Sequence, residues 1–324
     1  MKRTSPYHIL FAVFAVMVGT LASSPAGAQD TGTQPGAFSR MGFGARGIGM
    51  GNAMVANTLG DVVGYYNPAL LPWMESRYAG ATMGILTLDR RLNFLHISLP
   101  LPPNAGVSAG IINSGVSEID GRDSDGRPTG PLRTSENQFY LGFSLRFKAG
   151  FSLGINLKLY YYQLYTDISS TTVGLDIGAL YEVNETLIIG GAIRDLNSKY
   201  KWDTSSLYGQ SGQTSEVLFP LLYLLGVTYR LPGHIGLLSA EVEVSSVKTV
   251  LFRAGVEVPL VPELTLRGGI DRIDMKDEGN GIKPSLGFSA QKSLGDWTPA
   301  VQYTYVIEPF STSGIHLISV SAMF

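Results

Sequence analysis

The chain ends in the residues IHLISVSAMF, positions 315–324, and these residues alternate in side-chain character. One face of the segment carries His316, Ile318, Val320, Ala322 and Phe324. The opposite face carries Ser319 and Ser321. A period of two predicts a β-strand whose two faces meet different solvents. A final strand that ends in an aromatic residue is typical of outer-membrane β-barrels, so we expect Phe324 to be a signal for the barrel-assembly machinery.

The other end of the chain has the features of a secretory signal peptide. Lys2 and Arg3 form a basic start, residues 9–21 are almost wholly apolar, and the small residues 26–28 suit a cleavage site. An apolar core of about a dozen residues is too short to span a bilayer as a helix. The alternative is a membrane anchor, which Pro25 disfavours because proline breaks a helix. We therefore expect a signal peptide at 1–28 and export to the outer membrane.

Composition narrows the class of protein. The chain has no cysteine, 39 glycines, 16 tyrosines and 14 phenylalanines, and only 15% of its residues are charged. The missing cysteines exclude disulfides and thiolate metal sites, and the net charge of −2 offers no basic surface for nucleic acid. After the signal peptide, no apolar run reaches the roughly 18 residues of a transmembrane helix. Apolar residues spread over many short segments are expected of a barrel surrounded by outer-membrane lipids.

Fourteen segments between residues 78 and 324 read as strands, and an even number is usual for bacterial single-chain barrels. They are Tyr78–Leu88, Arg91–Leu99, Ala105–Ser114, Gln138–Phe147, Phe151–Leu164, Thr172–Tyr181, Thr186–Asp195, Leu221–Tyr229, Gly236–Val244, Thr249–Val258, Leu264–Ile273, Lys283–Gln291, Trp297–Val306 and Ile315–Phe324. The sequence therefore predicts an all-β fold, a transmembrane antiparallel barrel of about 14 strands.

The polar faces of these strands should point into the barrel, because a charge that faces hydrocarbon costs about 2–4 kcal/mol at mid-bilayer. The expected lumen-facing charges are Arg146, Lys158, Asp176, Arg194, Glu241, Glu243, Arg253, Glu257, Arg267 and Asp271. Arg253 and Arg267 lie on adjacent strands and could pair with Glu257 and Asp271. Three interpretations remain open: a salt-bridged lumen filled by a plug, a selective polar channel, or a ligand site in the lumen.

The connections alternate between short and long, as in barrels with short periplasmic turns and long outer loops. The two longest are Gly115–Asn137 and Leu196–Pro220, and a protein partner would bind there. The first contains Asp120, Asp123 and Asp125, which resemble part of a calcium loop. The twelfth-position glutamate is missing, so a solvated loop is favoured and no metal site is expected.

Residues 29–77 precede the first strand and are rich in glycine and other small residues. A glycine-rich segment can lie inside a barrel lumen, where irregular backbone is tolerated. The glycines resemble a phosphate loop in density only, because no Gly-Lys-Ser/Thr follows them. We therefore expect a plug, or hatch, at 29–77, followed by the barrel at 78–324.

Catalysis is not expected from this sequence. The histidines after the signal peptide, His96, His234 and His316, fall in separate strands or turns. None stands with a serine in a recognisable catalytic motif, and no cofactor is implied.

The glycine-rich segment resembles the N-terminal signature of the PorV/PorQ outer-membrane proteins, which are relatives of the FadL long-chain fatty-acid transporters. The resemblance covers nearly the whole mature chain, including the stretches 44–53, 66–71, 152–158, 174–181 and 266–269 and the terminal strand. The plug motif that it implies consists of Gly44, Arg46, Gly49, Gly51, Asp61, Asn67, Pro68 and Ala69. Leu70 departs from the pattern, since glycine is usual there.

The resemblance implies a FadL-like barrel of 14 strands and two alternative functions. The first is a non-enzymatic, PorV-like component of protein secretion or surface assembly, whose partner is a secreted protein or a secretion-system component. The second is a FadL-like transporter, which carries a hydrophobic ligand across the outer membrane. The same barrel can serve either function.

Overall fold

The computed structural model describes residues 34–148, 150–165, 167–274, 281–309, 311 and 313–324. The predicted signal peptide lies outside the described residues. Short helices come first in the described chain, and strands follow from Tyr78 to Met323. None of the described helices is both long and apolar enough to cross a bilayer.

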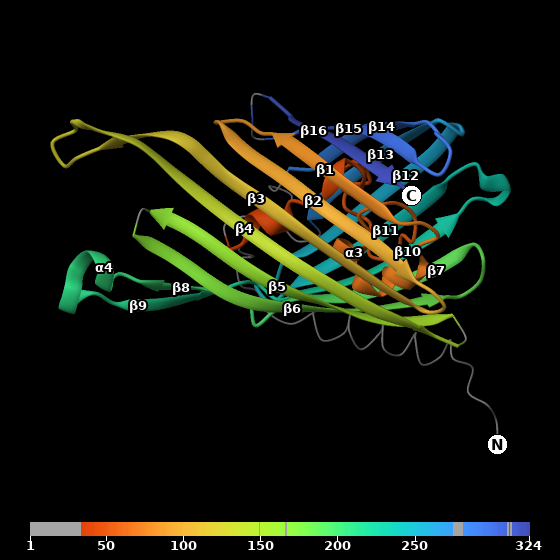
Figure 1. The fold of residues 1–324 in the computed structure, drawn as a ribbon, viewed down its shortest axis with the longest axis horizontal. Coiled ribbons are helices and arrows are strands. Elements are labelled where there is room, and N and C mark those ends of the chain that lie inside the picture. The colour runs from red at the N-terminus through yellow and green to blue at the C-terminus, as the bar shows by residue number, and fades with distance from the viewer. Residues whose placement is uncertain (1–33, 149, 166, 275–280, 310, 312) are drawn as a thin grey trace, which may run out of the picture.

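Fourteen strands close into one antiparallel barrel, in which β1 pairs with β16 (Figure 1). They are β1 (Tyr78–Ile85), β2 (Arg90–Leu101), β3 (Ala105–Arg122), β4 (Pro128–Phe147), β5 (Phe151–Tyr165), β6 (Ile168–Glu182), β7 (Leu187–Leu196), β10 (Leu222–Arg230), β11 (Leu237–Ser245), β12 (Val250–Val261), β13 (Leu264–Asp274), β14 (Lys283–Gln291), β15 (Thr298–Val306) and β16 (Ile315–Met323). Closure leaves no unpaired sheet edge in the wall. The predicted fold class is confirmed.

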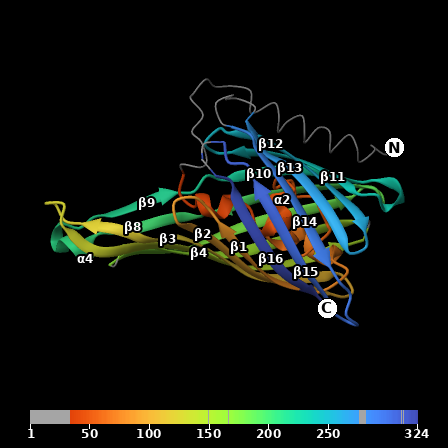
Figure 2. The ribbon, with the colours of Figure 1, turned by 90° about the horizontal axis from the view of Figure 1, so that it is seen from above.

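Between β7 and β10 the chain leaves the wall and forms a separate two-stranded sheet. It comprises β8 (Lys199–Asp203), the short helices α4 (Ser205–Tyr208) and η4 (Gly209–Ser211), and β9 (Thr214–Leu218). We call residues 199–218 the arm. Figures 1 and 2 both place α4 near one end of the molecule, where the β3–β4 hairpin also ends.

Each predicted strand overlaps one barrel strand, but both of the longest predicted connections contain further strand, β8 and β9 in one and extensions of β3 and β4 in the other. Most of Gly115–Asn137 is strand, because β3 continues to Arg122 and β4 begins at Pro128. These extensions pair with each other beyond the apolar part of the wall. Polar residues occupy both of their faces there, so the sequence shows no alternation to reveal a strand.

The two faces of the wall differ as the alternation predicts. In β5, exposed apolar residues such as Leu153, Ile155 and Leu157 alternate with buried polar residues such as Asn156 and Lys158. In β16, Ile318 and Val320 are exposed, and the intervening Ser319 is buried. The outer surface is therefore a belt of apolar side chains and the inner surface is polar.

Residues 34–74 lie inside the barrel (Figures 1 and 2), and residues 75–77 lead from there into β1, where Arg77 pairs with Phe324. Their helices are η2 (Ala37–Arg40), α2 (Gly44–Gly49), α3 (Val63–Tyr66) and η3 (Pro68–Trp73). We call residues 34–77 the inner segment. Nearly every side chain from Gly42 to Leu71 is buried.

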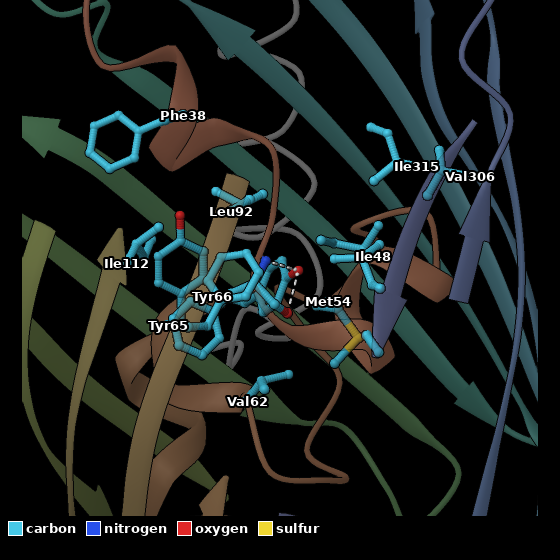
Figure 3. Packing of buried hydrophobic residues seen from close by; sticks show 14 of the residues in the cluster. Phe38, Ile48, Met54, Val62, Tyr65, Tyr66, Leu92, Ile112, Val306 and Ile315 are labelled. Atoms are coloured by element: carbon cyan, nitrogen blue, oxygen red, sulfur yellow. Dashed lines mark hydrogen bonds between the residues drawn. The ribbon is translucent and has the colours of Figure 1, made fainter. Parts of the chain in front are cut away.

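The inner segment packs against apolar residues that the wall turns inward. Figure 3 shows Tyr65 and Tyr66 of the segment on the side of Leu92 of β2 and Ile112 of β3, and Ile48 on the side of Val306 and Ile315. Phe43 is central to this cluster, because its ring stacks on Tyr65 at 4.7 Å and contacts Phe94 at 4.8 Å. The hydrophobic core of the protein therefore lies between the inner segment and the wall.

Candidate functional site

Charged side chains line the inner face of the wall in two clusters, on β5–β7 and on β11–β13. The predicted lumen-facing charges that are buried are Lys158, Asp176, Arg194, Glu241, Glu243, Arg253, Glu257, Arg267 and Asp271. Arg146 is half-buried at one end of β4. Its guanidinium stacks on the Trp73 ring at 3.5 Å and lies 3.5 Å from a Glu182 carboxylate oxygen.

Arg253 organises the cluster on β11–β13. Its guanidinium contacts Glu241 at 2.8 Å, Glu243 at 2.9 Å and Asp271 at 2.7 Å. Arg267 lies opposite Glu257 in the β12–β13 register, and its Nε is 2.5 Å from that carboxylate. Arg253 and Arg267 were expected to be partners of Glu257 and Asp271, without an assignment of which arginine binds which carboxylate. Each wall carboxylate in this cluster therefore has a cation on the wall.

Lys158 organises the cluster on β5–β7, where its Nζ lies 2.8 Å from Asp176 and 2.9 Å from Asp195. The Tyr160 hydroxyl also donates to Asp195, at 2.6 Å. Sequence reasoning missed Asp195, because alternation from the inward Arg194 places it on the outer face. Asp195 has a φ of 64°, and the β6–β7 pairing shifts register nearby. A bulge of this kind re-aims a side chain, which here points inward.

The inner segment binds the same wall charges. Arg46 donates to Glu257 at 2.7 Å, and Asn52 donates to Asp271 at 3.0 Å. The backbone N–H groups of Met54 and Val55 both donate to one Glu241 oxygen, at 3.1 and 3.0 Å. The inner segment therefore binds carboxylates whose negative charge is already balanced by arginines of the wall.

Wall hydroxyls hold the backbone of α2. The Ala45 N–H donates to Ser319 at 3.0 Å, and the Thr304 hydroxyl donates to the Ala45 carbonyl at 2.7 Å. Ser285 donates to the carbonyl of Gly49 at 3.2 Å. The Ala45 N–H and the Gly49 carbonyl are among the end groups that a short helix leaves without helical partners, and the Thr304 hydroxyl adds a bond to the Ala45 carbonyl.

Glycines of the wall make room for the inner segment, and sequence reasoning missed them. A Cβ on Gly178 would lie 2.0 Å from Asn67 Oδ1, and one on Gly190 would lie 2.3 Å from the Val55 carbonyl oxygen. A Cβ on Gly269 would lie 2.0 Å from the Gly51 nitrogen. The sequence signal that could have revealed them is the recurrence of glycine at inward-facing positions of successive strands.

The remaining residues of the plug motif also contact the wall or shape the segment. The Asn67 side-chain amide donates to the Val55 carbonyl at 2.7 Å and to Ala179 of the wall at 3.1 Å. Its oxygen accepts from the Ala69 N–H, so Asn67 caps η3, and Pro68 occupies the first helical position. Asp61 accepts from Gln302 of β15 at 3.1 Å.

Gly44 and Gly51 have φ values of +70° and +60°, which residues with a Cβ rarely adopt. Gly49 faces Thr304, and a Cβ built on it would lie 2.7 Å from the Thr304 hydroxyl oxygen. Leu70, which stands where the PorV/PorQ proteins usually have glycine, is fully buried in a cluster with Leu180 and Ile188. A leucine at this position therefore adds to the packing of the segment on β6 and β7.

In the described part of the chain, two small cavities lie between the inner segment and the β13–β16 side of the wall. One holds about 30 Å³ and is lined partly by Ile48, Leu92 and Leu317. The other holds about 80 Å³ beside Asp61 and Gln302. Ligand pockets usually measure about 300–1,000 Å³, so these two spaces admit water but no larger ligand in this conformation.

Other residues singled out in the sequence have local structural contacts. Asp123 accepts from the N–H groups of Asp125 and Arg127 at 2.9 and 2.8 Å, which closes a tight turn. Within the described residues, no three His, Cys, Asp or Glu side chains lie together as a metal site would need. His316 is exposed and contacts the Tyr303 hydroxyl at 2.8 Å. Phe324 stacks on Trp297 at 5.3 Å, and its role in assembly stays a prediction.

The arm is fixed to the extensions of β4 to β6. The Tyr200 hydroxyl donates to Glu136 at 2.8 Å, and Trp202 contacts Tyr162 with ring centroids 5.2 Å apart. The neighbours of Glu136 in β4 that face away from the lumen are the polar residues Ser135 and Asn137. The contact between Tyr200 and Glu136 therefore lies beyond the apolar belt. Burial raises the pKa of the Glu136 carboxyl, and the Tyr200 hydrogen bond opposes this shift.

The arm should be held less firmly as pH rises. Because the folded-state pKa of Glu136 is raised, its contribution to stability is complete below its ordinary pKa of 4.5. That contribution is lost as pH rises through the raised folded-state pKa. Hydrogen exchange of residues 199–218, corrected for intrinsic rates, should speed up over this range. The Glu136→Gln variant should show no such change, and an identical pH dependence in both proteins would contradict the assignment.

The Gly178→Ala variant should loosen the inner segment. The added methyl group would overlap the Asn67 oxygen, so Asn67 must lose its bonds to the wall. Faster cleavage of residues 34–77 by proteinase K in folded protein is the expected result. Gly268→Ala is the matched control, because a Cβ there meets its nearest neighbour at 3.6 Å. Equal protection in the two variants would show that the glycine is not required.

The Arg253→Met variant should destabilise the barrel strongly. It leaves three buried carboxylates without their shared cation, and breaking a buried ion pair costs about 3–5 kcal/mol. Urea unfolding in lipid vesicles would measure the loss. Arg122→Met is the control, because its partner Asp120 is 82% exposed and an exposed pair contributes about 1 kcal/mol at most. Similar losses in both variants would contradict the central role of Arg253.

Comparisons with known proteins show the fold. No family model matches the chain, and no curated protein matches it. The solved structure of the Pseudomonas putida toluene transporter TodX is similar, with a TM-score of 0.61 and 12% identity over 87% of this chain and 96% of that one. The CymD monoaromatic hydrocarbon channel has a TM-score of 0.63 and 12% identity, covering 87% and 97%. A FadL homologue from Pseudomonas aeruginosa has a TM-score of 0.60 and 12% identity, covering 87% and 98%. The chain therefore has the fold of the FadL-like barrels.

Proposed function

We propose that this protein is an outer-membrane conduit for small hydrophobic molecules and that the inner segment closes it. The fold is that of FadL-like barrels, and two of the similar solved structures, TodX and CymD, are described as a toluene transporter and a monoaromatic hydrocarbon channel. The PorV/PorQ resemblance has no further support from these comparisons. A function in protein secretion therefore rests on the sequence resemblance alone.

One observation carries the proposal: the lumen wall contains an apolar strip that the inner segment covers. Leu92 and Phe94 of β2, Ile112 of β3 and Leu317 of β16 point inward and are fully buried against the segment. Inward positions of an open, water-filled channel are ordinarily polar. A hydrophobic solute could replace the side chains of the segment on this strip, and the 30 Å³ cavity beside Leu92 and Leu317 lies at its edge.

The charged cluster on β11–β13 is compatible with movement of the inner segment. Glu257 keeps Arg267, and Asp271 keeps Arg253, when Arg46 and Asn52 withdraw. Removing one partner of a buried pair is costly mainly because it strands the other charge. Here the wall charges remain paired, so the cost falls on Arg46, which would become solvated.

A disulfide between α2 and β15 should test whether movement of the segment opens the conduit. A Cβ on Gly49 would lie 3.7 Å from the Thr304 Cβ, within the range of about 3.5–4.5 Å for disulfides. The natural chain has no cysteine, so the Gly49→Cys/Thr304→Cys pair would be its only thiols. Uptake of labelled toluene by cells that carry the oxidised variant should fall to the level of cells without the barrel. A reductant should restore it.

The Thr304→Cys single variant controls for loss of the hydroxyl and should take up toluene with or without oxidant. Labelled glucose tests for a non-selective leak. If the native protein gave no toluene uptake above empty cells, the conduit itself would be rejected. If the oxidised pair took up toluene as well as the reduced pair, the role of α2 in closure would be rejected instead.

A further inference from the structure

The arm has two sheet edges, one on β8 and one on β9. The pairing of its backbone groups shows which residues of each strand point toward the edge. The Phe219 N–H donates to the Ser198 carbonyl at 3.0 Å, and the Thr204 N–H donates to Gln213 at 3.1 Å. Hydrogen-bonded pairs alternate along an antiparallel ladder. In the observed register, Tyr200–Val217 and Trp202–Ser215 are therefore the bonded pairs within the arm.

It follows that Thr214, Glu216 and Leu218 of β9 turn their backbone N–H and C=O groups away from β8. Among the described residues, no hydrogen bond outside the β8–β9 ladder ends on these groups. All five residues of β9 are exposed. The outer edge of β9 is therefore a row of unpaired donors and acceptors, which is a template for another strand.

The corresponding edge of β8 is already occupied by the wall. The Lys201 N–H donates to the Ser170 hydroxyl of β6 at 2.8 Å, and the Thr172 hydroxyl donates to the Lys199 carbonyl. These two hydroxyls of β6 bind two of the backbone groups on this edge of β8, the Lys201 N–H and the Lys199 carbonyl. Because β6 lies against the edge of β8, the exposed edge of β9 is the one that an additional strand can reach.

We propose that the edge of β9 binds an extended peptide segment of another protein as a third strand of the arm. This inference is independent of whether the lumen conducts. The side chains of the arm indicate the pattern that such a peptide should have. Tyr200 and Trp202 share one face with Val217 and pack on Tyr162 of β5. Lys199, Lys201 and Glu216 share the opposite, outward face.

The matching peptide should therefore alternate apolar residues toward the wall with polar residues outward. Val217 is 41% exposed and offers an apolar contact on the wall side. The Glu216 carboxylate on the outward side binds Lys199 at 2.8 Å and is still 45% exposed. A lysine or arginine of the peptide that lies opposite Glu216 would share this carboxylate. In this arrangement the basic residues of the peptide turn their backbone groups toward β9.

A second copy of this chain, pairing through its own β9, fits this edge less well than the peptide described above. The antiparallel register that would pair all five residues of β9 with themselves places Glu216 directly opposite Glu216. Like charges directly opposite each other destabilise a strand pair. Shifted registers would avoid this contact but pair fewer residues.

The test is the affinity of a synthetic peptide of alternating lysine and tyrosine, blocked at both termini, for the full chain in detergent. Fluorescence anisotropy of the labelled peptide would report binding. Glu216→Pro removes an N–H from the open edge and leaves the β8–β9 bonds intact, and proline is tolerated at such edge positions. Glu216→Gln is the matched control, because it removes the same charge but keeps the N–H. We expect Glu216→Pro to bind about tenfold more weakly than Glu216→Gln, as loss of one edge hydrogen bond predicts.

Two modified peptides separate strand addition from nonspecific adhesion. N-methylation of the lysine amides should abolish binding, because those groups face β9. N-methylation of the tyrosine amides should leave it unchanged. Hydrogen exchange of β8 verifies that the arm of Glu216→Pro remains folded.

The proposal would be overturned by equal affinity of the Pro and Gln variants or by equal effects of the two methylation patterns. Absence of binding to the native arm would overturn it as well. Dimers of the native chain that Glu216→Pro abolishes would show that the edge pairs with a second copy instead.

Discussion

The burial of charged side chains inside a closed barrel is the constraint on which the rest of this structure depends. A buried charge needs a partner, and the wall supplies these partners across neighbouring strands. Arg253 of β12 reaches Glu241 and Glu243 on β11 and Asp271 on β13. A slip of one residue would turn Arg253 toward lipid, at a cost of about 2–4 kcal/mol at mid-bilayer. The ion pairs and the apolar belt therefore specify the same strand register.

The inner segment satisfies the same constraint by using backbone groups as well as side chains. Glu241 accepts two backbone N–H groups of the segment, and Thr304 and Ser319 bind both polar groups of the Ala45 residue. Such contacts require the segment backbone to approach the wall closely. Inward glycines such as Gly178 and Gly269 permit that approach. The glycine content of the chain thus has a structural cause in the strands as well as in the segment.

Much of the fold could be predicted because a bilayer imposes a strict alternation on each strand that crosses it. The limits of the prediction are equally physical. Beyond the bilayer, β3 and β4 continue with polar residues on both faces, so periodicity disappears while hydrogen bonding persists. Asp195 escaped prediction because a bulge reverses its direction. The partners of Arg46 and Asn52 could not be found from sequence, since contacts between a segment and a distant strand leave no local pattern.

The lumen wall has a charged side on β11–β13 and an apolar side on β2 and β3. These two sides would need different covering if the inner segment moved away. The strands β11–β13 present charges that are already paired with one another, so water can cover them when the segment leaves. The inward residues Leu92, Phe94 and Ile112 have no such substitute, because exposing apolar surface to water costs about 25 cal/mol per Å². In the closed barrel the segment covers them with Phe43, Ile48 and Tyr65. A hydrophobic solute can also cover them, whereas an ion or a sugar cannot. An open state of this lumen is therefore more favourable with an apolar solute bound, which couples opening to the class of molecule that we propose it carries.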